Sequence, residues 1–226
     1  MKKMSKPLAL LLAGMMVFGT ACGSSNSTGS SGADSAGAAE TAESTAADGT
    51  VATDTSVVIG QSSEVANLNP MIQPRTPDSN VQSMIFSYLV VPDEELNYEG
   101  DLADSWDISD DGTVYTFHLK EGVKWHDGEP FTAEDVKFTF EAIMDPANES
   151  ENAPDYEDIE SIEVIDEHTV AFHLSNVNTA FLEYMTKPVM PKHLLEGEDW
   201  QTSDFFRAPV GTGPYKFVSW DAGQTI

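Results

Sequence analysis

The 226-residue sequence has one cysteine, few basic residues and no long apolar run after its first 20 positions. A single cysteine excludes an internal disulfide and any zinc site built on cysteine ligands. The chain has 38 acidic residues and only 11 basic ones. Because such a chain repels phosphate backbones, we predict no nucleic-acid binding. The later apolar runs are all shorter than the roughly 18 residues that a membrane-spanning helix needs.

The first 22 residues have the layout of an export signal. Three lysines precede an apolar stretch over residues 7–18, and three small residues over 19–21 stand before Cys22. Small residues directly before a cysteine resemble the bacterial lipobox, whose cysteine becomes the lipidated first residue, although Gly19 stands where Leu is usual. We therefore predict a lipoprotein signal peptide over 1–22, with Cys22 as the lipidation site and membrane attachment through that lipid. An ordinary secretory signal is the alternative.

Residues 23–56 have the composition of a flexible tether. Ser, Thr, Ala and Gly fill 27 of these 34 positions, and no aromatic residue is present. Such a segment buries too little apolar surface to offset its ordering entropy, so we predict that it is disordered. A flexible coil of this length has an r.m.s. end-to-end distance of roughly 30 Å, which suits a linker between a membrane anchor and a folded body.

Residues 57–226 form the part of the chain with periodic patterns, and they carry 33 acids and 8 bases. Helical spacing of apolar residues predicts one helix over 77–89 and a second that Thr132 opens and Asp145 ends. Alternation predicts hairpins over 106–119 and 162–174. Shorter elements complete the prediction: strands over 57–61 and 214–220, a helix over 178–185 and a helical turn over 191–195. Interleaved strands and helices with short hairpins indicate an α/β or α+β body.

The sequence gives little support for catalysis. It has no nucleophile-elbow motif and no Gly-rich loop that leads into a helix, and we predict no enzyme activity, no cofactor and no metal site. His118 and His173 occupy matching positions of the two predicted hairpins, and two imidazoles could begin a metal site. A secreted metal-dependent hydrolase that uses these residues and His126 is the alternative from another class. Solvated histidines are the simpler interpretation.

Several motifs occur in a fixed order along the body. Residues 102–136 contain LADSW, DDG, YTFHL and GVKWHDGEPFTAEDV, LNP precedes them at 68–70, and PKHL and PVGTGPY follow at 191–194 and 209–215. This series resembles the signature of the family 5 extracellular solute-binding proteins. These proteins are the oligopeptide-, dipeptide- and nickel-binding components of ABC importers. The resemblance extends over residues 57–226.

The resemblance implies a fold and a domain organisation. Members are periplasmic-binding-protein-like two-lobed clamps of type II, in the large three-domain variant, and are more than twice as long. We therefore expect an N-terminal fragment that is incomplete at its C-terminus. The expected parts are domain I over 57–88, domain II over 89–178 and a truncated return to domain I over 179–226.

The resemblance also implies a function. We expect a lipoprotein at the outer face of the cytoplasmic membrane that captures oligopeptides or dipeptides and delivers them to ABC permease subunits. The full-length protein is expected to be a monomer. A nickel chelate or an oligosaccharide is the alternative ligand within the family.

Two segments are implied as ligand contacts. Peptide ligands of the family lie extended and pair with backbone, and the matching segment here is Gln73, Pro74, Arg75 and Thr76. Proline has no N–H, so backbone pairing there would use Gln73 and Arg75. The loop over 148–156 would face the same cleft, with Asn148, Asn152 and Tyr156 as candidate contacts. Ordinary surface loop is the alternative for both segments.

Overall fold

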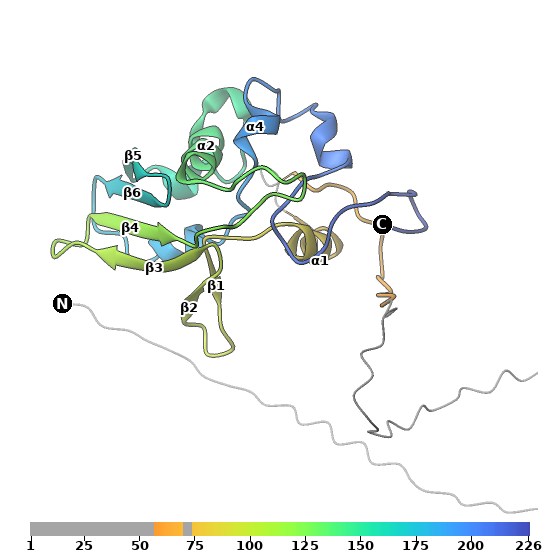
Figure 1. Ribbon diagram of the computed structural model, residues 1–226, viewed down its shortest axis with the longest axis horizontal. Coiled ribbons are helices and arrows are strands. Elements are labelled where there is room, and N and C mark those ends of the chain that lie inside the picture. The colour runs from red at the N-terminus through yellow and green to blue at the C-terminus, as the bar shows by residue number, and fades with distance from the viewer. Residues whose placement is uncertain (1–56, 70–73) are drawn as a thin grey trace, which may run out of the picture. The chain divides into compact units, whose positions relative to one another are not determined.

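The computed structural model describes residues 57–69 and 74–226, and Figure 1 shows their arrangement. The signal peptide with Cys22, the tether and Gln73 lie outside the described residues. The regular elements are α1 (Thr76–Ile85), β1 (Val90–Pro92), β2 (Tyr98–Gly100), β3 (Ala103–Ile108), β4 (Val114–Leu119), α2 (Ala133–Met144), β5 (Ile159–Asp166), β6 (Thr169–Leu174), α3 (Phe181–Tyr184) and α4 (Lys192–Leu195). Three short 3₁₀ helices are η1 (Pro146–Asn148), η2 (Ala153–Tyr156) and η3 (Asp204–Arg207). No helix in the described part of the chain is long and apolar enough to span a membrane.

A four-stranded antiparallel sheet with the order β3-β4-β6-β5 organises the body. Both predicted hairpins are confirmed, since β3 pairs with β4 and β5 with β6. The alternation along β4 puts Tyr115, Phe117 and Leu119 on the buried face. A separate two-stranded sheet, β1 with β2, forms a hairpin of its own (Figure 1).

Helix α2 confirms the second predicted helix, since Thr132 and Asp145 stand at its two ends, and it covers the buried face of this sheet. Its stripe of Val136, Phe140 and Ile143 is completely buried. The Phe140 ring meets Phe172 of β6 edge-on at 5.3 Å between centroids, and Phe172 meets Phe117 of β4 at 5.7 Å. These three rings join the helix to the two central strands and form the centre of the core.

Asp135 in the first turn of α2 explains much of the sequence signature. Its carboxylate accepts hydrogen bonds from the backbone N–H of Thr132 (2.9 Å), the backbone N–H of Lys192 (2.9 Å) and Nε1 of Trp125 (3.4 Å). Burial raises the pKa of Asp135, and these hydrogen bonds oppose the rise without cancelling it. One buried carboxylate therefore joins the Trp125 turn, the start of α2 and the start of α4.

Helix α1 is shorter than its sequence pattern predicts, because it ends at Ile85 rather than at residue 89. The carbonyls of Met84 and Ile85 would accept from residues 88 and 89 in a continued helix. They accept instead from the N–H groups of Tyr215 (3.0 Å) and Gly213 (2.8 Å). Long-range hydrogen bonds with a distant segment therefore end the helix.

The PVGTGPY segment fits between α1 and the turn that contains His126. A Cβ atom on Gly211 would overlap the Ile85 carbonyl, so this close approach of two backbones requires glycine. The same segment also contacts the His126 turn. The Nδ1 atom of His126 accepts a hydrogen bond from the Gly211 N–H (3.3 Å), and its Nε2 donates one to the Gly213 carbonyl (2.8 Å). The motif therefore has a structural role in packing, and both ring nitrogens of His126 form hydrogen bonds with it.

Two predicted strands are wrong within the described residues. Residues 57–61 and 214–220 are irregular, and the side chains of Val58 and Val218 are 93% and 89% exposed. Both segments have the β-branched and aromatic residues of strands, but neither finds a partner strand in the part of the chain that the structure describes. A strand needs a hydrogen-bonding neighbour, which local composition cannot supply. The predicted helix over 178–185 is also shorter and occupies Phe181–Tyr184.

Candidate functional site

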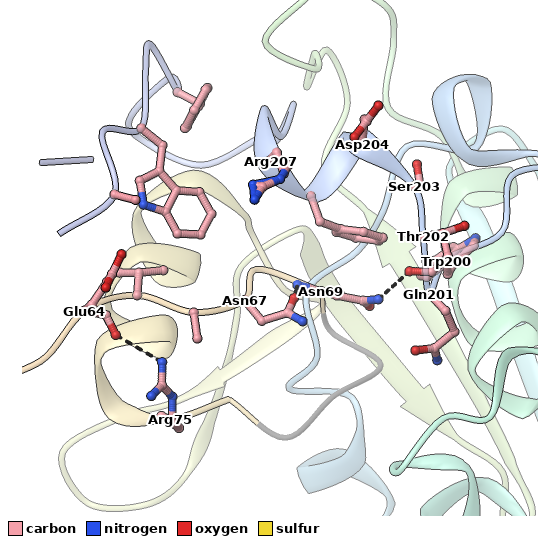
Figure 2. A pocket seen from close by; sticks show the side chains of 16 residues that line it. Glu64, Asn67, Asn69, Arg75, Trp200, Gln201, Thr202, Ser203, Asp204 and Arg207 are labelled. Carbon is pink, nitrogen blue, oxygen red and sulfur yellow. Dashed lines mark hydrogen bonds between the residues drawn. The ribbon is translucent and has the colours of Figure 1, made fainter.

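A hollow of about 910 Å³ lies between the segment before α1, the η3 region and the last irregular segment (Figure 2). This volume falls within the roughly 300–1,000 Å³ that is usual for small-ligand sites. The first segment contributes residues 64–67, Asn69 and Arg75, the second contributes residues 200–204, Phe206 and Arg207, and the third contributes Phe217, Trp220 and Ala222. Segments that are far apart in sequence therefore meet around one concavity.

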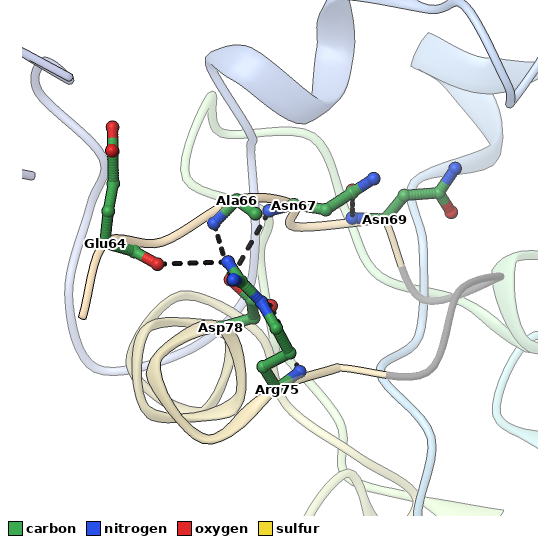
Figure 3. Close-up of polar contacts among 6 residues, drawn as sticks. All are labelled: Glu64, Ala66, Asn67, Asn69, Arg75 and Asp78. Carbon is green, nitrogen blue, oxygen red and sulfur yellow. Dashed lines mark hydrogen bonds and ion pairs between the residues drawn. The ribbon is translucent and has the colours of Figure 1, made fainter. Parts of the chain in front are cut away.

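Asp78 holds the first wall of the hollow in place (Figure 3). Its carboxylate accepts from the backbone N–H groups of Ala66 (2.7 Å) and Arg75 (3.0 Å) and from Nε of Arg75 (3.2 Å). The Arg75 guanidinium also donates to the Glu64 carbonyl at 3.0 Å. Asp78 thus fixes the segment before α1 and the Arg75 side chain against each other.

The same hydrogen bonds determine the titration of Asp78. Burial alone would raise its pKa, but the bonds from Ala66 and Arg75 outweigh burial, and the pKa is lowered below its usual value. A lowered carboxyl pKa stabilises the fold above the unfolded-state pKa of about 3.9. That contribution is lost as the pH falls through the folded-state pKa, so this wall of the hollow is firmly held at neutral pH.

Two further hydrogen bonds connect the second wall to its neighbours. Nδ2 of Asn69 donates to the Trp200 carbonyl at 2.6 Å, and this bond is buried. Nε2 of Gln201 donates to the Asn148 carbonyl at 2.6 Å. The loop that begins at Asn148 therefore borders the hollow through Gln201, while Arg75 lines it directly.

The predicted contact residues differ in their positions. Pro74 and Thr76 are exposed beside Arg75, and Gln73 lies outside the described residues. Asn152 is buried, and its Oδ1 accepts from Nζ of Lys187 at 3.1 Å. Tyr156 is buried as well, and its hydroxyl donates to the Tyr184 carbonyl at 2.7 Å. The structure thus places Arg75 in the lining of the hollow, Asn148 beside it through Gln201, and Asn152 and Tyr156 in buried positions.

Arg75 faces the hollow with its side chain rather than its backbone. Its N–H donates to Asp78, and its carbonyl accepts from the Ser79 N–H at 2.9 Å in the first turn of α1. Both main-chain groups of Arg75 therefore already have hydrogen-bond partners at the start of α1. The backbone pairing that the family resemblance implies for Arg75 is not available in this conformation, whereas its guanidinium has donors left over.

Sequence reasoning missed the second and third walls of the hollow. Trp200, Phe206, Phe217 and Trp220 give it aromatic surface, and Arg207 gives it a positive charge. One signal was present: the sequence contains only two arginines, at 75 and 207, and both line this hollow.

Lys187 was also overlooked. Burial lowers its pKa, and the nearby acids Asp155 and Glu183 oppose that effect.

The structure separates the histidines that a hydrolase would need. In the β4–β6 register His118 lies opposite Thr169 while His173 lies opposite Val114, so the two are four positions, or about 13 Å, apart along the strands. His118 pairs with Asp107 (3.0 Å) and His173 with Glu163 (3.2 Å), and His126 is held by the PVGTGPY segment. Among the described residues, no three His, Cys, Asp or Glu side chains gather in a way that could hold a metal ion.

The comparisons with known proteins define the class. The sequence model described as "Bacterial extracellular solute-binding proteins, family 5 Middle" matches residues 97–226. The chain therefore belongs to family 5 of the bacterial extracellular solute-binding proteins. The resemblance seen in the sequence motifs is confirmed, and so is the fold class, which is that of the periplasmic binding proteins.

Individual members of the family are similar over most of the body. The oligopeptide-binding protein AppA of Bacillus subtilis is 32% identical over 176 residues, which cover 75% of this chain and 32% of the relative. The crystal structure of NikZ from Campylobacter jejuni in complex with Ni(L-His) has a TM-score of 0.66 at 43% identity and covers 70% of this chain and 32% of that one. The structure of B. subtilis AppA in complex with a nonapeptide has a TM-score of 0.68 at 32% identity and covers 71% and 33%. The chain thus spans about one third of the length of these relatives.

Proposed function

We propose that this protein is the lipid-anchored solute-binding component of an ABC importer. It captures oligopeptides or dipeptides outside the cytoplasmic membrane and delivers them to membrane permease subunits, without catalysing a reaction. Family membership supports the solute-binding role, and the names of relatives such as oligopeptide-binding protein AppA support peptide as the ligand. The leader and tether support the anchored location.

The hollow is the observation that carries this proposal. It is a concavity of ligand size with aromatic walls, and Asp78 fixes the wall that bears Arg75. Aromatic side chains provide apolar contact, while a few fixed polar groups orient a ligand. Two residues of the proposed peptide-contact segments, Arg75 and Asn148, lie at or beside this concavity.

A thermal-shift screen of the full chain against peptides of two to nine residues tests the proposal. Peptides that bind the native state should raise its stability by about 2.7 kcal/mol at a hundredfold excess over Kd. Nickel with L-histidine serves as the comparison ligand, because the NikZ structure contains it. A screen in which only the nickel complex stabilises the protein would contradict the peptide assignment and favour a nickel-chelate receptor.

Replacing Cys22 tests the anchor. We expect Cys22→Ala to move the protein from the membrane fraction to the soluble fraction and to abolish the incorporation of labelled fatty acid. The physical reason is that acyl chains supply the membrane affinity, about 0.8 kcal/mol for each buried methylene group. Ser24→Ala, two residues further on, is the matched control and should stay with the membrane. Continued membrane retention of the Cys22 variant would disprove the lipid anchor.

A further inference from the structure

We infer that His126 positions the third wall of the hollow and that protonation of its ring releases this wall, so that ligand affinity falls as the pH falls. The statement about affinity rests on the proposed function. The release of the wall is a property of the protein without a ligand and can be measured separately.

The two hydrogen bonds of the His126 ring require a neutral imidazole with its proton on Nε2. The Gly213 carbonyl can only accept, so Nε2 at 2.8 Å must carry a proton. The Gly211 N–H can only donate, so Nδ1 at 3.3 Å must offer a lone pair. A second proton on the ring would occupy this lone pair. Protonation therefore sets two donors against each other and breaks the bond to Gly211.

The structure gives the Gly211 N–H no easy replacement for that acceptor. Gly211 is buried, and its carbonyl accepts from the backbone N–H of His126 at 2.9 Å. On its other side a Cβ would overlap the Ile85 carbonyl, so the backbone cannot move closer to α1. A buried donor without an acceptor is unfavourable. Once His126 is protonated, the strain is relieved when the PVGTGPY segment moves away from the ring.

The PVGTGPY segment leads directly into the third wall. Nζ of Lys216 donates to the His126 carbonyl at 2.7 Å, and the next residue, Phe217, lines the hollow. The N–H groups of Gly213 and Tyr215 donate to carbonyls at the end of α1. The His126 turn and α1 therefore hold this segment from two sides. Loss of the first side leaves Phe217 and the wall residues after it less firmly placed.

The charged groups around the ring favour this response. The titratable residues of the surrounding elements are Lys124, Asp127 and Glu129 of its own turn, Lys192 and His193 of α4, and Lys216. Asp127 accepts from Nε2 of His193 at 2.8 Å. Burial would raise the pKa of Asp127, but the hydrogen bonds from His193 and the Glu129 N–H outweigh burial and lower it.

Asp127 therefore stays ionised over the range of about pH 5–8 in which histidines change charge. When His193 becomes positive, its hydrogen bond to Asp127 becomes charge-assisted and stronger. Acid thus holds the turn more firmly against α4 while it frees the PVGTGPY segment from His126. The release is confined to the side of the turn that supports the hollow.

Hydrogen exchange of the ligand-free full chain at about pH 7.5 and about pH 5 tests the release. Protection factors are compared, because they correct for the intrinsic effect of pH on exchange. We expect the protection of the Gly211, Gly213 and Tyr215 amides to fall about tenfold at the lower pH, which corresponds to the loss of roughly one hydrogen bond. The amides of the β4–β6 pair should keep their protection.

Variants separate titration of His126 from a purely structural role. His126→Asn keeps an acceptor for the Gly211 N–H and does not titrate, so its protection should be the same at both pH values. His126→Phe keeps a ring without either bond and should be weakly protected at both. His118→Asn and His193→Asn are the controls and should keep the wild-type pH profile. A wild-type profile in His126→Asn, or its loss in His193→Asn, would overturn the role of His126.

Calorimetric titration with the tightest-binding histidine-free peptide of the thermal-shift screen tests the effect on affinity. The wild type should bind it about tenfold more weakly at the lower pH, and His126→Asn should bind it equally at both. Release of the segment without a change in affinity would overturn the link to the hollow and leave the proposed function standing. If no peptide binds, the proposed function fails, and hydrogen exchange still decides whether His126 releases the wall.

Discussion

Phe140→Ala should lower the free energy of unfolding by about 3–5 kcal/mol, the range for a fully buried phenylalanine in a tight core. The ring has no exposed surface and makes an edge-on contact with Phe172 at 5.3 Å. Its removal would leave a cavity between α2 and the sheet, and the regular elements on both sides cannot close in to fill it. Urea denaturation followed by circular dichroism measures the loss.

Ile165→Ala is the control for this truncation. Ile165 is 54% exposed on the edge strand β5, so its loss should change stability by no more than about 0.5 kcal/mol. A Phe140 variant that kept wild-type stability and lost only peptide affinity would contradict the placement of this ring in the core. It would make Phe140 a ligand contact instead.

Asp135→Ala should destabilise the protein by about 3 kcal/mol or more. The substitution leaves four donors without their acceptor: the backbone N–H groups of Thr132 and Lys192, the Thr132 hydroxyl and Nε1 of Trp125. Each unsatisfied buried donor costs about 1–3 kcal/mol, and relief from burying a charge offsets only part of that total. The neighbouring Glu134→Ala is the control. Its carboxylate forms an exposed pair with Lys192 at 3.0 Å, which is worth about 0–1 kcal/mol.

The pH dependence of Asp135→Asn gives an independent check. Burial raises the folded-state pKa of Asp135, so folding favours the protonated carboxyl group. The resulting contribution to stability is complete below the unfolded-state pKa of about 3.9. This contribution is lost as the pH rises through the folded-state pKa. The stability advantage of the wild type over Asp135→Asn should therefore shrink as the pH rises above the unfolded-state pKa of about 3.9. An advantage that grows as the pH rises would mean that the hydrogen bonds outweigh burial and that the pKa is lowered.

Local patterns predicted the elements whose partners are near in sequence. The β3–β4 and β5–β6 hairpins and helix α2 follow from alternation, turn residues and a buried stripe within one short window each. The end of α1 could not be predicted in this way. Carbonyls of its last turn accept from Gly213 and Tyr215, about 130 residues further along, and no local pattern records such a contact.

The candidate site was predicted less completely than the fold, for a similar reason. The family resemblance gave Arg75 and Asn148, but it suggested backbone pairing for Arg75, whose backbone groups the start of α1 occupies. The aromatic wall and Arg207 come from the irregular region after α4, where periodicity carries no information. Only the scarcity of arginine in an acidic chain marked that region in advance.

Hydrogen exchange of the full chain, with and without a peptide taken from the stability screen, tests most directly whether the hollow is the solute-binding site. We predict slower amide exchange at residues 64–69 and 200–207 when the peptide is bound, with little change in β3 through β6. Protection confined to the four-stranded sheet, with residues 64–69 and 200–207 unchanged, would contradict the assignment of the hollow as the solute-binding site.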